Sequence, residues 1–218
     1  MKLAEFGLES GWGMETRLPF RLQTKCMTSM WARILPRVET KDCWKILIEC
    51  VPEVKDTRIL NLLGAYTVEC RCDVPSFLAE TSSERKCRWI SDVIHESATR
   101  VAAAHGWDVA AFAATHRDIE RAHFVNLWHW RKPLRSPSRK MFAEIACHHR
   151  LDAMVLTLNI RAYSPESAQD PPLATAHIEA DTGELGYARL LGRLRWDDAR
   201  RASLYGKDGA RVLTASVR

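Results

Sequence analysis

The sequence lacks the long apolar run that a membrane-spanning helix requires. No stretch of its 218 residues approaches the roughly 18 consecutive apolar side chains of such a helix. Residues 1–20 carry charges and glycines where a secretory signal peptide would keep an apolar core. We therefore expect a cytoplasmic protein with no membrane among its partners.

Local motifs for nucleotide or hydrolase chemistry are also missing. The sequence contains no G-x-x-x-x-G-K-[ST] loop, no G-x-G-x-x-G after a strand, no H-E-x-x-H and no G-x-S-x-G. His95 and Glu96 begin the third pattern, but Thr99 stands where its second histidine would be. We expect a non-catalytic protein without a cofactor, and a metal-dependent Cys/His enzyme is the third alternative.

The seven cysteines are odd in number and widely spread, which favours reduced, mostly buried thiols. Metal ligands could come from Cys70 and Cys72 together with His148 and His149, since zinc takes four tetrahedral thiolate or imidazole ligands. The cysteine pairs of a zinc ribbon are absent. The alternative is that both thiols pack in the core and the two histidines lie at the end of a hairpin.

A catalytic Cys-His pair is formally available in Cys147 and His129, with Asp152 to orient the imidazole. No local signature accompanies these residues. His116 lies on the apolar side of a predicted helix, and we interpret it as a hydrogen-bonded core histidine in preference to a metal ligand.

Composition is that of a folded globular protein, with 46% hydrophobic and 27% charged residues. The 32 Lys and Arg exceed the 27 Asp and Glu by five, an excess that permits an acidic partner, either protein or nucleic acid. We predict an N-terminal extension over residues 1–41, partly ordered at best, because glycines punctuate it and Met14, Met27 and Met30 leave a later start open. Residues 42–218 are expected to form a single α+β domain.

Two amphipathic helices are predicted in the middle of the chain. One begins after the N-cap candidates at 81–83 and ends at His105 and Gly106; the other is capped by Asp108 and reaches His123. Apolar or alternating runs predict strands at 44–50, 65–72, 141–147, 154–161, 174–180, 187–196, 202–205 and 211–216. The expected fold is an antiparallel twisted sheet or sandwich of about seven to nine strands, with the helical hairpin inserted after the second strand.

The segment 128–140 combines two tryptophans with five cations and is the best candidate for a binding surface. Trp and Arg dominate the energetic centres of protein interfaces, and the same pair can stack on bases and neutralise phosphate. Alternation predicts a strand with Trp128 and Trp130 on one face. We expect these indoles in the core and the opposite face exposed. The predicted partner-binding residues are His129, Arg131, Lys132, Arg135, Arg139 and Lys140.

Four segments resemble small bacterial immunity proteins of polymorphic-toxin and contact-dependent inhibition systems. They are WKILIECVPE at 44–53, LGAYTV at 63–68, KPLRSPSRK at 132–140 and LGRLRW at 191–196. The resemblance spans about residues 44–216 and transfers no individual functional residue. It implies a non-catalytic protein that binds and neutralises a cognate toxin domain, with nucleic-acid binding through 128–140 as the alternative. One departure is the basic charge, because immunity proteins that cover nuclease toxins are usually acidic.

Overall fold

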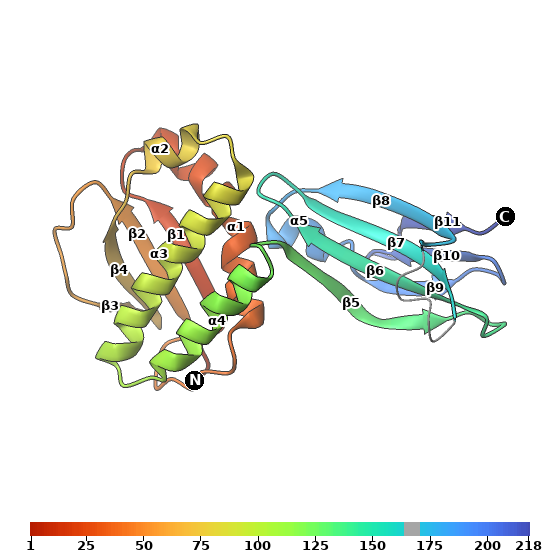
Figure 1. The fold of residues 1–218 in the computed structure, drawn as a ribbon, viewed down its shortest axis with the longest axis horizontal. Coiled ribbons are helices and arrows are strands. Elements are labelled where there is room, and N and C mark those ends of the chain that lie inside the picture. The colour runs from red at the N-terminus through yellow and green to blue at the C-terminus, as the bar shows by residue number, and fades with distance from the viewer. Residues whose placement is uncertain (164–170) are drawn as a thin grey trace. The chain divides into compact units, whose positions relative to one another are not determined.

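The computed structural model describes residues 1–163 and 171–218, and these divide into two compact units, Met1–Asn126 and Leu127–Arg218. Eleven strands and five helices are present in the described part of the chain (Figure 1). The α+β class is therefore confirmed, whereas the strand number and the sheet layout differ from the expected antiparallel sheet or sandwich of about seven to nine strands. Strands form three sheets, one in unit 1 and two in unit 2.

Unit 1 is built on a four-stranded sheet in the order β1-β2-β4-β3. Its strands are β1 (Glu5–Ser10), β2 (Lys45–Val51), β3 (Leu60–Leu62) and β4 (Ala65–Arg71). β1, β2 and β4 run parallel, and only the short β3 is antiparallel to its neighbour. The parallel pairing of β1 and β2 needs a crossover connection, which is the helix α1 (Met14–Ile34).

Residues 1–41 thus differ from the predicted extension, because β1 and the whole of α1 belong to the ordered unit. Gly7 suggested a break, yet it lies within β1 and opposite Leu47. A Cβ there would stand 3.0 Å from Leu47 Cδ1, so the close approach of the side chain explains the glycine. On α1, Phe20, Met27 and Trp31 are fully buried at helical spacing.

The other helices of unit 1 are α2 (Val74–Ala79), α3 (Ser83–Ala104) and α4 (Val109–Arg121). Ser82 and Asp108 accept backbone N–H bonds as the N-caps of α3 and α4, as predicted. α1, α3 and α4 pack together on one side of the sheet (Figure 1). Beneath them the sheet presents buried apolar side chains such as Phe6, Ile48 and Val68.

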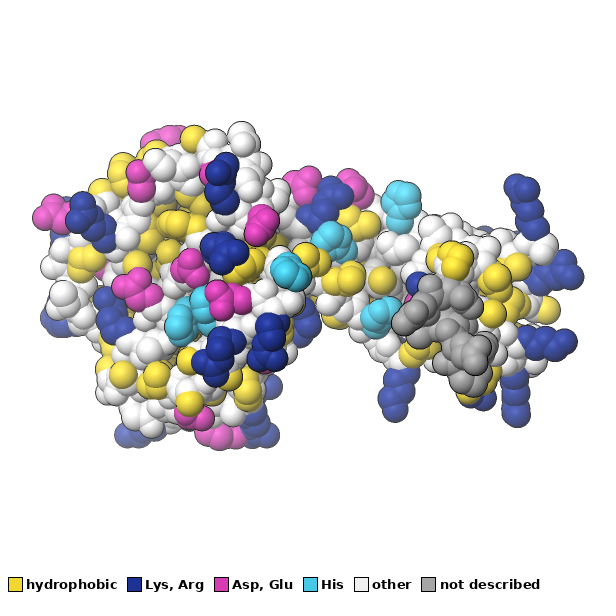
Figure 2. Space-filling view, in the orientation of Figure 1, with side chains coloured by type: hydrophobic (Ala, Val, Ile, Leu, Met, Phe, Trp, Pro, Cys, Tyr) yellow, Lys and Arg dark blue, Asp and Glu magenta, His cyan; other side chains and the backbone are white. Residues whose placement is uncertain are grey.

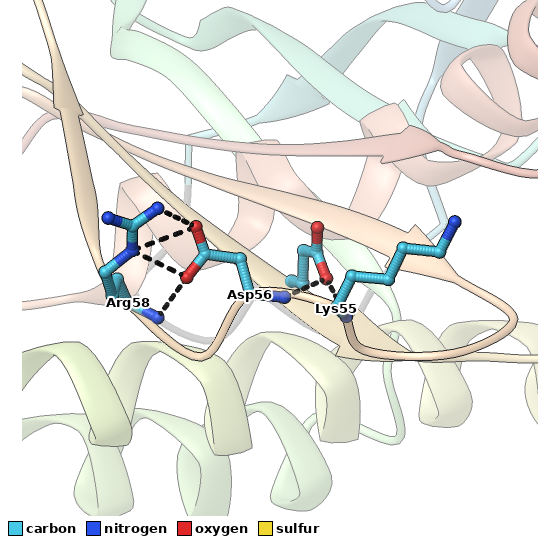
Figure 3. A network of polar contacts seen from close by, with 4 residues as sticks. Lys55, Asp56 and Arg58 are labelled. Atoms are coloured by element: carbon cyan, nitrogen blue, oxygen red, sulfur yellow. Dashed lines mark hydrogen bonds and ion pairs between the residues drawn. The ribbon is translucent and has the colours of Figure 1, made fainter.

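The opposite face of this sheet carries acidic side chains. Glu9, Glu49 and Glu69 stand in register on three neighbouring strands. Glu69 Oε2 accepts hydrogen bonds from the backbone N–H groups of Lys55 at 2.6 Å and Asp56 at 3.0 Å. The Asp56 carboxylate in turn pairs with Arg58, as Figure 3 shows. Glu69 therefore fastens the loop between β2 and β3 to β4.

Unit 2 contains a four-stranded and a three-stranded sheet. The first has the order β5-β6-β7-β8, with β5 (Asn126–Arg135), β6 (Met141–His149), β7 (Met154–Ala162) and β8 (Ala174–Ala180). The second has the order β11-β10-β9, with β9 (Arg193–Trp196), β10 (Arg201–Tyr205) and β11 (Arg211–Ser216). Antiparallel pairing joins β6 to β7, β7 to β8, β9 to β10 and β10 to β11, and the two sheets pack as a sandwich (Figure 1).

The core of unit 2 lies between these sheets, where Ile145, Leu156 and Leu158 face Leu204 and Leu213. One predicted strand, at 187–196, is wrong in its first half: α5 (Glu184–Ala188) ends there and β9 begins only at Arg193. Tyr187 is buried from this helix. A short apolar run cannot distinguish a helical turn from a strand by periodicity alone, which explains the error.

Candidate partner-binding surface

All six predicted partner-binding residues lie in the hairpin formed by β5, the turn at 136–140 and the start of β6. Ser136 N donates to Met141 O at 2.9 Å, and Arg139 N donates to Ser136 O at 2.9 Å, which closes the turn. Each of the six is exposed: His129, Arg131, Lys132, Arg135, Arg139 and Lys140. Lys and Arg side chains project from several points of unit 2 in Figure 2.

The register of β5 follows the predicted alternation. Trp128 and Trp130 are half-buried and pack against the core of unit 2, while His129 and Arg131 are exposed. Arg131 has a φ of 62°, unusual for a residue other than glycine, so the strand is locally irregular beyond Trp130. From that point the side chains of β5 remain exposed to its end.

Two hairpin arginines stack on aromatic rings. The Arg131 guanidinium lies 4.5 Å from the ring centre of Trp130, and that of Arg135 lies 3.9 Å from the ring centre of Tyr163. Arg135 also donates to the Tyr163 hydroxyl. Such stacking orients a guanidinium while leaving N–H groups on its edge for carboxylates or phosphates.

His129 is held by a carboxylate. Its Nδ1 lies 3.3 Å from Glu144 Oε2, and the other oxygen of Glu144 accepts from Arg161 Nε at 2.9 Å. Glu144 is largely buried between His129 and Arg161, whereas His129 is half-exposed. This arrangement fixes the imidazole at the surface, where it can donate or accept one hydrogen bond from a partner.

The position of β5 offers a second explanation for its composition. β5 is the end strand of its sheet, and unpaired strand edges attract other strands. Such an edge is prevented from pairing by a charged side chain, a proline and an irregular backbone, which β5 has at Lys132, Pro133 and Arg131. The same residues can therefore protect an edge and contact a partner.

The positive charge of the protein belongs to unit 2. Residues 127–218 carry 15 Lys and Arg against 10 Asp and Glu, whereas residues 1–126 carry 17 of each. Unit 2 thus accounts for the whole net charge of +5. An acidic macromolecule would be attracted to this unit first.

The four residues considered as metal ligands are not brought together. Cys70 and Cys72 lie in unit 1, and His148 and His149 lie in unit 2. On β6 the two histidines point to opposite faces, and His149 is buried while His148 is half-buried. No three ligating side chains converge on a possible metal position within residues 1–163 and 171–218.

Cys70 and Cys72 instead form a hydrogen bond with each other, and Cys72 forms another with Cys50. The pKa of Cys70 is raised by its hydrogen bond with Cys72 and by burial, and the pKa of Cys72 is raised first by a hydrogen bond with Cys50. Neutral thiols are poor metal ligands and poor nucleophiles. These cysteines contribute to packing at the ends of β2 and β4.

The Cys147–His129 pair is not formed either. Cys147 lies in the core of unit 2, while His129 is exposed on the outer side of β5. Burial raises the pKa of the Cys147 thiol to about 12, so it stays protonated at neutral pH. Asp152 is paired with Arg150 at 3.0 Å.

His116 is a hydrogen-bonded histidine of the helical layer, as interpreted from the sequence. Its Nε2 lies 2.9 Å from Asp92 Oδ1, and only 14% of its side chain is exposed. Its ring stacks on His95 with centres 4.5 Å apart, and both rings lie near the buried Trp31. The face-to-face stack prevents the two imidazoles from converging on one ion.

A second basic cluster was missed by sequence reasoning. Arg195 stacks at 4.2 Å on Tyr205, and Arg211 lies 5.7 Å from the same ring centre. Asp197 joins them through Arg195 Nε at 3.1 Å and the Tyr205 hydroxyl at 2.9 Å. Alternation of Arg193, Leu194 and Arg195 was the available signal, but only strand register brings Arg211 beside them.

Comparisons of the chain with protein-family models, with curated proteins and with solved structures found no match. No helix in the described ranges has the length and apolar character needed to traverse a bilayer.

Proposed function

We propose that this protein is a non-catalytic binding protein whose β5–β6 hairpin contacts an acidic partner protein, and that the partner is a bacterial toxin domain which it neutralises. One observation carries the proposal: six exposed polar and cationic residues gather on one hairpin of the unit that holds all the excess positive charge. Arginines fixed on aromatic rings fit the energetic centre of a protein interface.

The toxin as partner rests on the immunity-protein resemblance. We place its action in the cytoplasm, where cysteines stay reduced; all seven are free thiols in the structure. A basic immunity protein would suit a toxin whose active surface is acidic.

Co-expression tests this proposal. The product of the adjacent gene should arrest growth alone, and co-expression of this protein should rescue it. The two should co-purify with a dissociation constant of about 1 nM, equivalent to about −12 kcal/mol. Arg131→Glu combined with Lys132→Glu should abolish rescue, whereas Arg17→Glu on α1 should not. A neighbouring product that is neither toxic nor bound would refute the toxin assignment.

Nucleic acid is the second candidate, because Arg131, Lys132, Arg135, Arg139 and Lys140 lie on one hairpin. If these cations contact phosphates, the affinity for single-stranded DNA should fall with salt, with a log–log slope of roughly −0.7 per phosphate neutralised. Replacing Arg131 and Lys132 by Ala should then make the slope less steep by the contribution of about two phosphate contacts. An affinity that does not change with salt concentration would exclude nucleic-acid binding.

A further inference from the structure

Three arginines surround Tyr205 on the outer face of the three-stranded sheet. Arg193 on β9 and Arg211 on β11 are both register partners of Tyr205 on β10. Arg195 covers the ring of Tyr205, and its Nη2 donates to the tyrosine hydroxyl at 2.8 Å. Positive charge from two strands is thereby concentrated over a single tyrosine.

Asp197 holds this cluster in place. Its Oδ2 accepts from Ser203 Oγ at 2.5 Å, and its Oδ1 accepts from both Arg195 and Tyr205. The carboxylate is only 13% exposed, while Arg195 remains 50% exposed. Hydrogen bonds fix the inner edge of Arg195, so a partner would bind a guanidinium that has already lost most of its conformational freedom.

The cluster is connected to the predicted hairpin. Trp196 Nε1 on β9 donates to Leu134 O on β5 at 3.1 Å, which joins the edges of the two sheets. The strand that carries Arg193 and Arg195 therefore lies beside the end of β5 that carries Arg135. We call the exposed set the cationic stripe, and its members are Arg131, Lys132, Arg135, Arg193, Arg195 and Arg211.

The aromatic rings along the stripe are already covered. Arg131 lies over Trp130, Arg135 over Tyr163 and Arg195 over Tyr205. Proteins that bind single strands without sequence preference offer open aromatic faces for base stacking. Here the surface offers guanidinium edges instead, which pair with carboxylates in a planar, bidentate geometry.

We infer that the cationic stripe is one continuous docking surface for the carboxylate-rich face of a partner protein, and that Arg193, Arg195 and Arg211 are part of it. The inference rests on the proposed function and extends it from the hairpin across β9 to β11. Charge complementarity selects an acidic partner, since unit 2 carries the entire net positive charge.

Poly-L-glutamate is the probe for this surface, and the full-length protein is titrated with it at low and moderate salt. Arg193→Gln combined with Arg211→Gln should weaken binding by about tenfold, while Arg195 and its contact with Asp197 are left intact. Arg200→Gln combined with Arg218→Gln removes the same charge from the far end of the same sheet. This control should change the affinity by less than about twofold. Thermal melts verify that both variants are folded.

A third variant, Arg131→Gln with Lys132→Gln, separates this inference from the proposed function. Loss of binding in the hairpin variant but not in the Arg193/Arg211 variant would exclude β9 and β11 from the docking surface. The hairpin would then remain as the binding site. Failure of the wild-type protein to bind poly-L-glutamate, or a control variant that weakens binding as much as the hairpin variant does, would overturn both the extension and the hairpin. Stronger binding of a single-stranded oligodeoxynucleotide than of poly-L-glutamate would replace the acidic protein by nucleic acid as the partner.

Discussion

His95 is a half-buried residue whose protonation should affect the stability of unit 1. Burial lowers its pKa, and the neighbouring His116 lowers it further, against smaller opposing effects of Asp92 and Glu120. Arg117 acts in the same direction as His116. The folded state therefore binds the proton on His95 less readily than the unfolded state does.

Stability of unit 1 should consequently fall at acidic pH. The unfolded imidazole has a pKa of about 6.5, so the favourable contribution is complete above that value and is lost as the pH falls towards the lower folded pKa. Urea denaturation between about pH 7.5 and pH 5 measures this. His95→Gln should flatten the profile, and His177→Gln, at an exposed position on β8, should not. A wild-type profile identical to that of His95→Gln would contradict the expectation.

Glu49 offers a second prediction at the residue scale. It lies in register between Glu9 and Glu69, and like charges on neighbouring strands are unfavourable. Glu49→Gln should stabilise the protein by roughly 0.2 to 1 kcal/mol, with a smaller gain at high salt. Glu53→Gln in the exposed loop is the control and should have little effect. A lower melting temperature for Glu49→Gln would show that this carboxylate has a favourable partner.

Among the elements, β5 is the one whose sequence serves two requirements. Its edge position calls for residues that resist strand pairing, and its exposed cations suit a partner. Lys132→Val combined with Pro133→Val should restore a regular, apolar edge and cause self-association, visible as increased light scattering. Lys207→Val in the β10–β11 turn is the control. Light scattering equal to that of the wild-type protein would mean that β5 needs no edge protection.

The two-unit organisation leads to a prediction for the whole molecule. Trp128 packs on the core of unit 2, so Trp128→Ala should cost that unit about 2 to 4 kcal/mol, less than a fully buried tryptophan. Hydrogen exchange should show lost protection in β5 to β11 and unchanged protection in β1 to α4. Equal loss in both units would mean that they unfold as one.

Elements with strong local signals were predictable. The capping residues Ser82 and Asp108 and the apolar spacing that follows them indicate α3 and α4 almost to their ends. Alternation likewise locates β6, β7 and β8. The parallel pairing of β1, β2 and β4 could not be predicted in this way, because the residue pattern of one strand does not show which strand it pairs with.

Local periodicity determined which side chains of each element are apolar, and hence that Trp128 and Trp130 turn inward while His129 turns outward. The composition of the sequence determined the total charge as well. Only the tertiary structure decided that this charge falls in unit 2, that Arg211 meets Arg195 at Tyr205, and that Cys70 and His148 stay in separate units. The physical reason is that strand register and chain division depend on contacts between distant residues, which no local pattern specifies.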